Sequence, residues 1–166
     1  MSKFLEKIKK IASENERVAM FVDMDGTITV YDVYPESEVE KKMAEGYQAA
    51  EPIEYVIDIL RKINDIPNVD IYILTLSRDR NITEEKKIWL KKYVDFVDPE
   101  KWIIITKEIG EYNKENRDVI KAEKMMKKLA DYNYEILLDD DHKVLKETQR
   151  ILNDKASVFH ISSAII

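Results

Sequence analysis

The sequence predicts an α/β domain with a doubly wound sheet of about five parallel strands. Five short apolar runs alternate with segments in which apolar residues recur every three or four positions, as in amphipathic helices. The runs lack a polar face, which is typical of parallel strands that helices cover on both sides. A length of 166 residues fits one domain, which we place at 1–166.

Each element has its own local signal. Apolar residues on one face predict the helices, while Pro52 suits the first turn of the second helix and Thr83 suits the N-cap of the third. Continuous apolar runs predict the strands. In chain order we expect helix 3–15, strand 17–22, helix 52–63, strand 69–74, helix 83–93, strand 102–106, helix 118–130, strand 134–138, helix 144–152 and strand 157–161.

The composition excludes several classes of function. The chain has no cysteine, which rules out disulfides, thiolate catalysis and cysteine-ligated metals, and its two histidines cannot form a three-histidine zinc site. A formal net charge of −6 argues against an extended nucleic-acid surface, whereas a small phosphorylated substrate needs only a local site. No apolar run approaches the ~18 residues of a membrane span, and the first residues lack a signal-peptide core. We therefore expect a cytoplasmic protein with no membrane partner.

Polar side chains follow three of the predicted strands at the point where each strand ends. The carboxyl ends of parallel strands meet at one edge of a sheet, and ligands bind there, near the switch point of the strand order. These side chains are therefore expected to lie together. They are Asp23 and Asp25 after the first strand, Thr75 and Ser77 after the second, and Asp139, Asp140 and Asp141 after the fourth.

Carboxylates gathered at one edge repel one another unless a cation lies among them, and such hard oxygen ligands suit Mg²⁺. A carboxylate can attack phosphorus to form an aspartyl-phosphate, and a second carboxyl group can act as general acid and base. A hydroxyl and an ammonium group can hold the phosphoryl oxygens as charge develops. Gly26 permits a turn that points backbone N–H groups at the same phosphate.

The stretches FVDMDGTIT, YILT and ILLDD resemble, in this order, the first, second and fourth motifs of the haloacid dehalogenase (HAD) superfamily. The resemblance implies a Rossmann-like, HAD-like domain with a minimal cap or none. It also implies that Asp23 is the nucleophile, that Asp25 is the general acid and base, and that Thr75 binds the phosphoryl group. The dehalogenase branch lacks an acid at the position of Asp25, so the resemblance favours phosphate transfer.

The same resemblance implies the metal ligands and the substrate contacts. Either Asp139 or Asp140 is the direct partner of Asp23 in the metal site, because the acidic pair of the fourth motif leaves both open. The implied Mg²⁺ site consists of Asp23, Asp25 through its carbonyl, Asp139 and Asp140. The implied substrate-binding residues are Gly26, Thr27, Leu76 and Ser77.

The family's third motif is a lysine, and three lysines are candidates. Within the superfamily the chain is most similar to the 5′(3′)-deoxyribonucleotidase group, whose lysine lies in a Glu-Lys-x-x-Trp stretch. Glu85, Lys86 and Trp89 match that stretch, so the resemblance implies Lys86 as the catalytic lysine. Lys121 matches the more common placement in the superfamily, but without a role in the site it belongs to a solvated helical face. Lys107 is the third candidate.

Residues 28–50 show neither the helix nor the strand period. In the superfamily this place holds a short flap or a small cap, and the stretch is too short for a full cap domain. Three tyrosines in it, Tyr31, Tyr34 and Tyr47, could stack on a base or close over the site.

The function expected from these observations is that of a Mg²⁺-dependent phosphomonoesterase acting through an aspartyl-phosphate on a small phosphorylated substrate. The nucleotidase resemblance makes a nucleoside monophosphate the first choice. Another small phosphate ester or a phosphorylated polynucleotide end is the alternative within the class. A receiver-type signalling domain with a phosphorylated aspartate and a catalytically inactive binding module are the alternatives from other classes.

Overall fold

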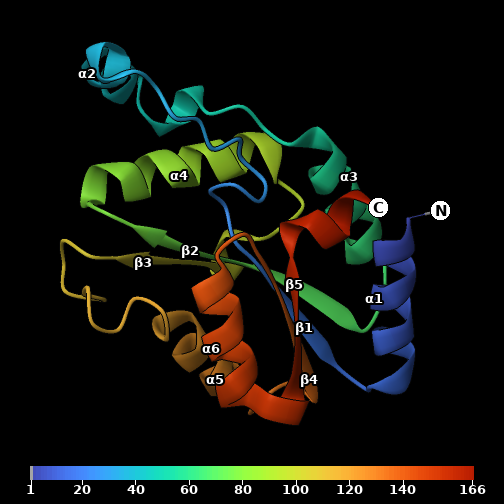
Figure 1. The fold of residues 1–166 in the computed structure, drawn as a ribbon. Helices are drawn as coiled ribbons and strands as arrows, with labels where there is room; N and C mark the ends of the chain where they lie inside the picture. Colours follow the sequence, from blue (N-terminus) through green and yellow to red (C-terminus); the bar gives the residue numbers. More distant parts are fainter. Residues whose placement is uncertain (1) are drawn as a thin grey trace.

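A computed structural model describes residues 2–166 and places five parallel strands in one sheet, in the order β3-β2-β1-β4-β5 (Figure 1). The order reverses between β1 and β4, and ligands bind at such a switch point. The predicted fold class is therefore confirmed. The strands are β1 (Val18–Val22), β2 (Val69–Ser77), β3 (Trp102–Thr106), β4 (Tyr134–Asp139) and β5 (Ala156–His160).

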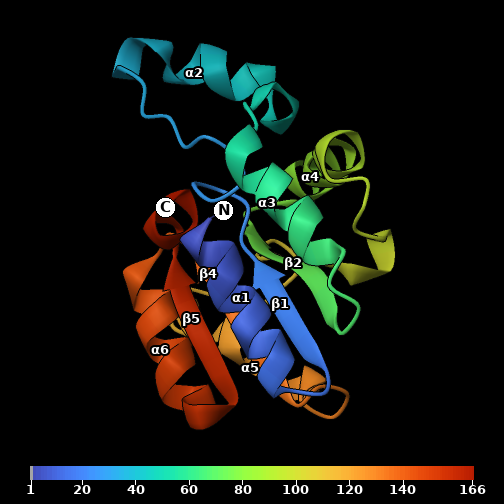
Figure 2. The same cartoon turned by 90° about the vertical axis from the view of Figure 1, so that its right-hand side faces the viewer.

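Helices cover both faces of the sheet, with α1 and α3 on one side and α5 and α6 on the other (Figure 2). β1 is central and entirely buried, because Met20 packs into the core on the α1 side and Phe21 into the core on the α5 side. No helix within residues 2–166 combines the length and apolar character that crossing a membrane requires. The helices are α1 (Lys3–Glu14), α2 (Glu36–Glu45), α3 (Glu54–Asn64), α4 (Arg80–Tyr93), α5 (Ile120–Lys128) and α6 (His142–Leu152).

The boundaries around the end of β2 differ from the sequence prediction. β2 continues to Ser77, because residues 75–77 pair with β3. α4 begins at Arg80 and not at Thr83, since the Asp79 side chain accepts a hydrogen bond from the backbone N–H of Ile82 (2.8 Å) and caps the helix. The extra strand residues carry the polar groups of β2 to the edge of the sheet.

Residues 28–50 begin in the core at Ile28 and contain α2 and a short 3-10 helix, η1 (Tyr47–Ala49). α2 projects from the rest of the domain (Figure 1). Every residue of α2 is exposed or half-buried, which explains why no apolar face marked it in the sequence. The base of this segment is held by α4. The Glu85 carboxylate accepts the backbone N–H of Tyr47 (2.9 Å), and the Trp89 indole donates to the carbonyl of Ala50 (2.9 Å).

Candidate active site

Asp23 and Asp139 meet at the switch point because β1 and β4 are paired in register. The pairing places Val22 opposite Leu138, and the backbone N–H of Asp23 donates to the carbonyl of Leu138 (3.0 Å). Asp140 follows, and carboxylate oxygens of Asp23, Asp139 and Asp140 lie within 4.8 Å of one another. They line a cavity of about 670 Å³ at the carboxyl ends of the strands.

Lys121 lies inside this cluster. Its Nζ is 2.8 Å from Oδ1 of Asp23 and 2.7 Å from Oδ2 of Asp139, and the residue is only 3% exposed. The interpretation of Lys121 as part of a solvated helical face is therefore wrong. Burial alone would lower the pKa of Lys121, but the two carboxylates raise it above its ordinary value, so the lysine is charged.

Lys86 organises a second cluster around the other aspartate of the first motif. Its Nζ donates to Oδ2 of Asp25 (3.0 Å), to the Thr75 hydroxyl (2.8 Å) and to the carbonyl of Leu76 (2.8 Å). Lys86 is 1% exposed, whereas the Asp25 side chain is 45% exposed and faces the cavity. The buried cation thus fixes a carboxyl group that a ligand can still reach.

The structure brings both candidate lysines to the site, each on a different aspartate, where the sequence treated them as alternatives. Lys86 reaches Asp25 from the second turn of α4, and Lys121 reaches Asp23 from the first turn of α5. Lys107, the third candidate, is exposed on the loop after β3. Two cations therefore face the two aspartates of the first motif.

The acidic cluster Asp23, Asp139 and Asp140 could hold a metal ion. Burial raises the pKa of Asp23, Lys121 opposes that shift, and Asp139 adds to it. Burial and the carboxyls of Asp23 and Asp139 raise the pKa of Asp140 to about 7. Three carboxyl groups thus share one lysine, which leaves negative charge that a further cation can neutralise. Because the donors are all hard oxygens, Mg²⁺ fits them.

Of the four predicted substrate-binding residues, three lie beside the acidic cluster or line the cavity, and the fourth, Ser77, lies in a turn. Gly26 has φ +73°, and a Cβ on it would overlap the Asp140 carboxylate, so the turn requires glycine. Thr27 is buried and donates to Oδ2 of Asp23 (3.4 Å), and Leu76 lines the cavity. Ser77 accepts from the Thr83 hydroxyl (2.7 Å) and donates to the Asp79 carbonyl (3.0 Å), within the turn from β2 to α4.

Arg117 was missed by the sequence reading although it lines the cavity. Its guanidinium donates to Asp141 (3.1 Å), the residue whose side chain caps α6. No motif marks Arg117, and its place in a loop after an edge strand is the one signal that could have pointed to it.

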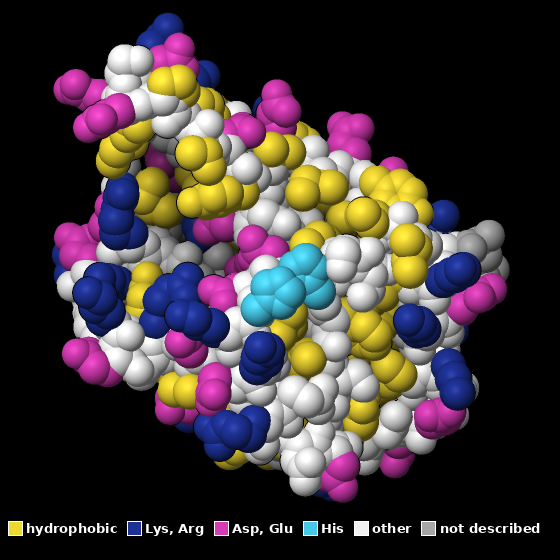
Figure 3. All heavy atoms as spheres, viewed as in Figure 1, with side chains coloured by type: hydrophobic (Ala, Val, Ile, Leu, Met, Phe, Trp, Pro, Cys, Tyr) yellow, Lys and Arg dark blue, Asp and Glu magenta, His cyan; other side chains and the backbone are white. Residues whose placement is uncertain are grey.

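Figure 3 shows Lys and Arg side chains along the hollow below α2, beside the stacked pair His142 and His160, whose ring centroids are 4.8 Å apart.

The three tyrosines of residues 28–50 take different positions. Tyr31 is 72% exposed and lines the cavity. The ring of Tyr47 lies 5.1 Å from Nζ of Lys86, and its hydroxyl is hydrogen-bonded to Thr29 (3.0 Å). Tyr34 bonds to Asp32 (3.1 Å) and lines a groove below α2. Tyr31 and Tyr47 are therefore the two aromatic residues of this segment that lie beside the aspartates.

At the level of sequence, no protein-family model and no curated protein matches this chain. Among solved structures, the HAD domain of effector protein Lem4 from Legionella pneumophila superposes with a TM-score of 0.49 at 17% identity, over 87% of each chain. The class C acid phosphatase from Bacillus anthracis superposes with a TM-score of 0.51 at 18% identity, over 96% of this chain and 74% of that chain. The chain has a HAD-like fold. At such identities the likeness of this HAD-like domain extends to the fold alone.

Proposed function

We propose that this HAD-like protein is a Mg²⁺-dependent phosphomonoesterase that acts through an aspartyl-phosphate on Asp23. One observation carries the proposal: Asp23 and Asp25, two residues apart, are each paired with a different buried lysine at the mouth of a cavity. A carboxylate and a reachable acid beside two fixed cations form the set of groups that phosphoryl transfer through a covalent intermediate requires.

In the first step, an Asp23 oxygen attacks phosphorus and the bond from phosphorus to the ester oxygen breaks. Asp25 gives its proton to the departing oxygen, so that an alcohol leaves. Asp25 suits this role because its side chain is partly exposed while Lys86 holds it from below. Lys86 also donates to the Thr75 hydroxyl (2.8 Å), and we assign both groups to the face of Asp25 where negative charge develops as the ester bond breaks.

In the second step, Asp25 takes a proton from a water molecule that attacks the phosphorus of the aspartyl-phosphate. The bond from phosphorus to Asp23 breaks, which releases inorganic phosphate and regenerates the carboxylate. Lys121 keeps Asp23 in place through both steps, because it also binds Asp139 on the neighbouring strand. Its charge disfavours protonation of Asp23, which would remove the nucleophile.

Mg²⁺ would be held by Asp23, by Asp139 or Asp140, and by the carbonyl of Asp25, and when bound it supplies positive charge against the carboxylates and the phosphate. Burial, together with the carboxyl groups of Asp23 and Asp139, raises the pKa of Asp140 to about 7, and the part due to these neighbours supports the assignment. Lys121 forms ion pairs with Asp23 and Asp139, so Asp140 is the member of the fourth-motif pair that Lys121 does not bind.

A nucleoside monophosphate is the proposed substrate, and another small phosphate ester is the alternative. Two features support the nucleotide. Tyr31 and Tyr47 offer aromatic surface beside Asp25, and α4 carries Glu85, Lys86 and Trp89 in the spacing of the nucleotidase group. A polynucleotide end is less suitable for a chain with a formal net charge of −6.

A receiver-type domain is disfavoured by the sheet. Receiver domains have the flavodoxin-like strand order 2-1-3-4-5, whereas this sheet has the order 3-2-1-4-5. An inactive binding module has no need for Asp25, which a cation holds at the mouth of the cavity.

The test is a hydrolysis screen of the purified protein with Mg²⁺ over nucleoside monophosphates, sugar phosphates, p-nitrophenyl phosphate and a phosphorylated oligonucleotide. We expect phosphate release that disappears with a chelator and in the Asp23→Asn variant. The Asp154→Asn variant, in which the change lies in the turn before β5, is the matched control and should keep full activity. No hydrolysis by the parent protein, or equal hydrolysis by Asp23→Asn, would overturn the proposal.

A further inference from the structure

The cavity has a second chamber next to the acidic cluster. It has a volume of about 360 Å³ and shares Asp25, Tyr31, Leu76 and Arg117 with the larger chamber. The two chambers therefore adjoin each other at these four residues. Asp25 borders both the acidic cluster and the second chamber.

The two chambers differ in charge. Within the described chain, the first is lined by five aspartates and three cations. The aspartates are Asp23, Asp25, Asp139, Asp140 and Asp141, and the cations are Arg117, Lys121 and Lys143. The lining of the second, as far as residues 2–166 show it, contains one carboxylate, Asp25, and three cations, Arg78, Lys86 and Arg117. Three tyrosines complete it: Tyr31, Tyr47 and Tyr112. The second chamber is thus positively charged and aromatic, whereas the first suits a metal ion and the reacting phosphate.

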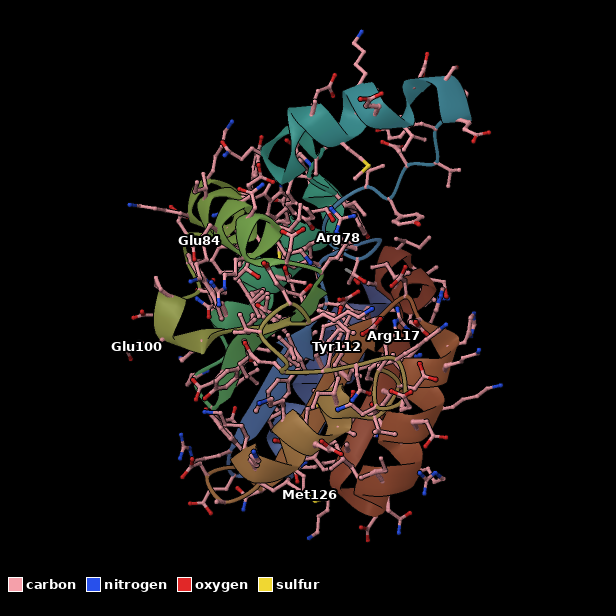
Figure 4. The ribbon with its side chains drawn as sticks, turned by 90° about the vertical axis from the view of Figure 1, so that its left-hand side faces the viewer. Arg78, Glu84, Glu100, Tyr112, Arg117 and Met126 are labelled. Atoms are coloured by element: carbon pink, nitrogen blue, oxygen red, sulfur yellow. The ribbon has the colours of Figure 1, made fainter. Side chains whose placement is uncertain are left out.

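The two arginines enter the second chamber from different parts of the fold. Arg78 follows β2, while Arg117 lies on the same loop as Tyr112, below Arg78 in the view of Figure 4. Arg78 contacts Asp79 at 3.3 Å, and Arg117 contacts Asp141 at 3.1 Å and Asp118 at 3.4 Å. A guanidinium has five N–H donors, so these contacts leave donors on both arginines for a ligand. The side chain of Arg78 is 64% exposed and that of Arg117 is 49% exposed.

The position of Asp25 tells which part of a substrate would occupy this chamber. If Asp25 protonates the departing oxygen, the phosphoryl group lies on the side of Asp23 and the leaving group lies on the opposite side of Asp25. We assign the leaving group to the chamber with Arg78 and Arg117, because this chamber borders Asp25 and its lining lacks Asp23, Asp139 and Asp140. An arginine pair recognises phosphate through several parallel N–H donors. The leaving group would then meet two guanidinium groups and three aromatic rings.

We propose that Arg78 and Arg117 form a subsite for a second phosphate on the leaving group. This narrows the nucleotide substrate proposed above, because a nucleotide that carries a second phosphate, a nucleoside bisphosphate, would be preferred over a simple monophosphate. The tyrosines provide the surface for the base. This inference rests on the proposed phosphatase function and names its substrate class. The small volume of the chamber and the formal net charge of −6 favour a free nucleotide over a polynucleotide end.

The test compares kcat/KM for adenosine 3′,5′-bisphosphate with kcat/KM for the 3′- and 5′-monophosphates. We expect the parent protein to prefer the bisphosphate by about tenfold or more, and the preference to shrink with added salt. Arg78→Gln and Arg117→Gln should each reduce this ratio severalfold, and the double variant should abolish the preference. Arg150→Gln, an exposed arginine on α6 paired with Glu147, is the matched control and should keep the ratio of the parent.

The outcomes separate this inference from the proposed function. p-Nitrophenyl phosphate, whose leaving group has no second phosphate, reports phosphatase activity alone, and its hydrolysis together with a ratio near one would overturn the subsite only. A preference for the bisphosphate that remains in the double arginine variant would also overturn the subsite only. A higher kcat/KM for a 5′-phosphorylated oligonucleotide than for the bisphosphate would overturn the assignment to a free nucleotide. Absence of hydrolysis for every ester would overturn the proposed function itself.

Discussion

Asp23 and Asp25 are close in sequence but lie in different surroundings: Asp23 is 6% exposed, whereas the side chain of Asp25 is 45% exposed. We predict that Asp23→Asn abolishes turnover while the fold persists, because an amide of the same shape cannot attack phosphorus. Steady-state kinetics, circular dichroism and the melting temperature check this. Activity near that of the parent, with an unchanged spectrum, would contradict the assignment of the nucleophile.

The two lysines give a second prediction. Lys86→Ala and Lys121→Ala should each lower turnover by ~10²-fold or more, because each removes a fixed cation from the site. Lys121→Ala should also lower the melting temperature in metal-free buffer, since Asp23 and Asp139 then lose their shared partner, and Mg²⁺ should restore part of it. Lys127→Ala on the exposed face of α5 is the matched control. Near-normal turnover in either active-site variant would exclude that lysine from catalysis.

Glu135 on β4 is a buried carboxyl group outside the site. It is 0% exposed, and neither carboxylate oxygen has a hydrogen-bond partner within the described chain. Burial raises the pKa of Glu135 to about 8. The protonated form of Glu135 is thus favoured in the folded state. The contribution of this group to folding stability is fully present below the ordinary pKa of about 4.5 and is lost as pH rises through about 8.

We therefore predict that the free energy of unfolding of the parent protein falls between about pH 5 and about pH 8 relative to that of Glu135→Gln, with a slope approaching ~1.4 kcal/mol per pH unit. Urea unfolding of both proteins over this range measures the difference between their free energies of unfolding. The contributions of the other titrating groups cancel in this difference, because both proteins share them. Parallel curves would show that Glu135 is ionised in the folded protein.

At the scale of elements, α4 connects the segment of residues 28–50 to the site. Glu85 and Trp89 hold the base of that segment, while Lys86 between them binds Asp25. Gly46 packs against Glu85 so closely that a Cβ would overlap its carboxylate. The segment is therefore attached to the same helix that carries Lys86.

Glu85→Ala should loosen this attachment without touching the aspartates. We expect faster limited proteolysis within residues 28–50 and a KM for nucleotides raised by roughly 3–10-fold, the effect of losing one hydrogen bond of ordinary strength. Glu84→Ala, one position earlier and exposed, is the matched control. Unchanged proteolysis together with an unchanged KM would show that the segment is held by other contacts.

The elements also show what the sequence can and cannot predict. The strands and most helices were predicted because burial on both faces leaves apolar runs and period-3.6 stripes. α2 was missed, since a helix that buries none of its residues needs no apolar face. The aspartates were predicted from their spacing, but the burial of Lys121 depends on how α5 is turned against β1, which local sequence does not encode. Arg117 lies in a loop without any motif.

At the scale of the whole molecule, the acidic cluster links metal binding to pH and stability. Because burial, Asp23 and Asp139 raise the pKa of Asp140 to about 7, this carboxyl group is protonated below that pH when no metal is bound. Mg²⁺ then has to displace a proton, so its affinity rises with pH. The increase in melting temperature caused by Mg²⁺ should therefore be larger at about pH 8 than at about pH 6.

Thermal unfolding with and without Mg²⁺ at several pH values measures this dependence. Asp140→Asn should flatten it, because the amide does not titrate. Asp118→Asn, a half-buried change beside Arg117, should leave it intact. An Mg²⁺ effect that does not vary with pH in the parent protein would place the metal away from Asp140.

The position of β1 has a consequence for synthesis. β1 pairs on one side with β4, which lies far along the chain: Val18 is opposite Tyr134. The contact between Asp23 and Lys121 likewise joins positions 98 apart. At ~5–20 residues per second, a ribosome needs roughly 6–20 s between these strands. During that interval a wholly apolar strand has an unpaired edge, which is where nascent chains aggregate. Slower translation before β4 would therefore lower the yield of folded protein more than the same delay after it.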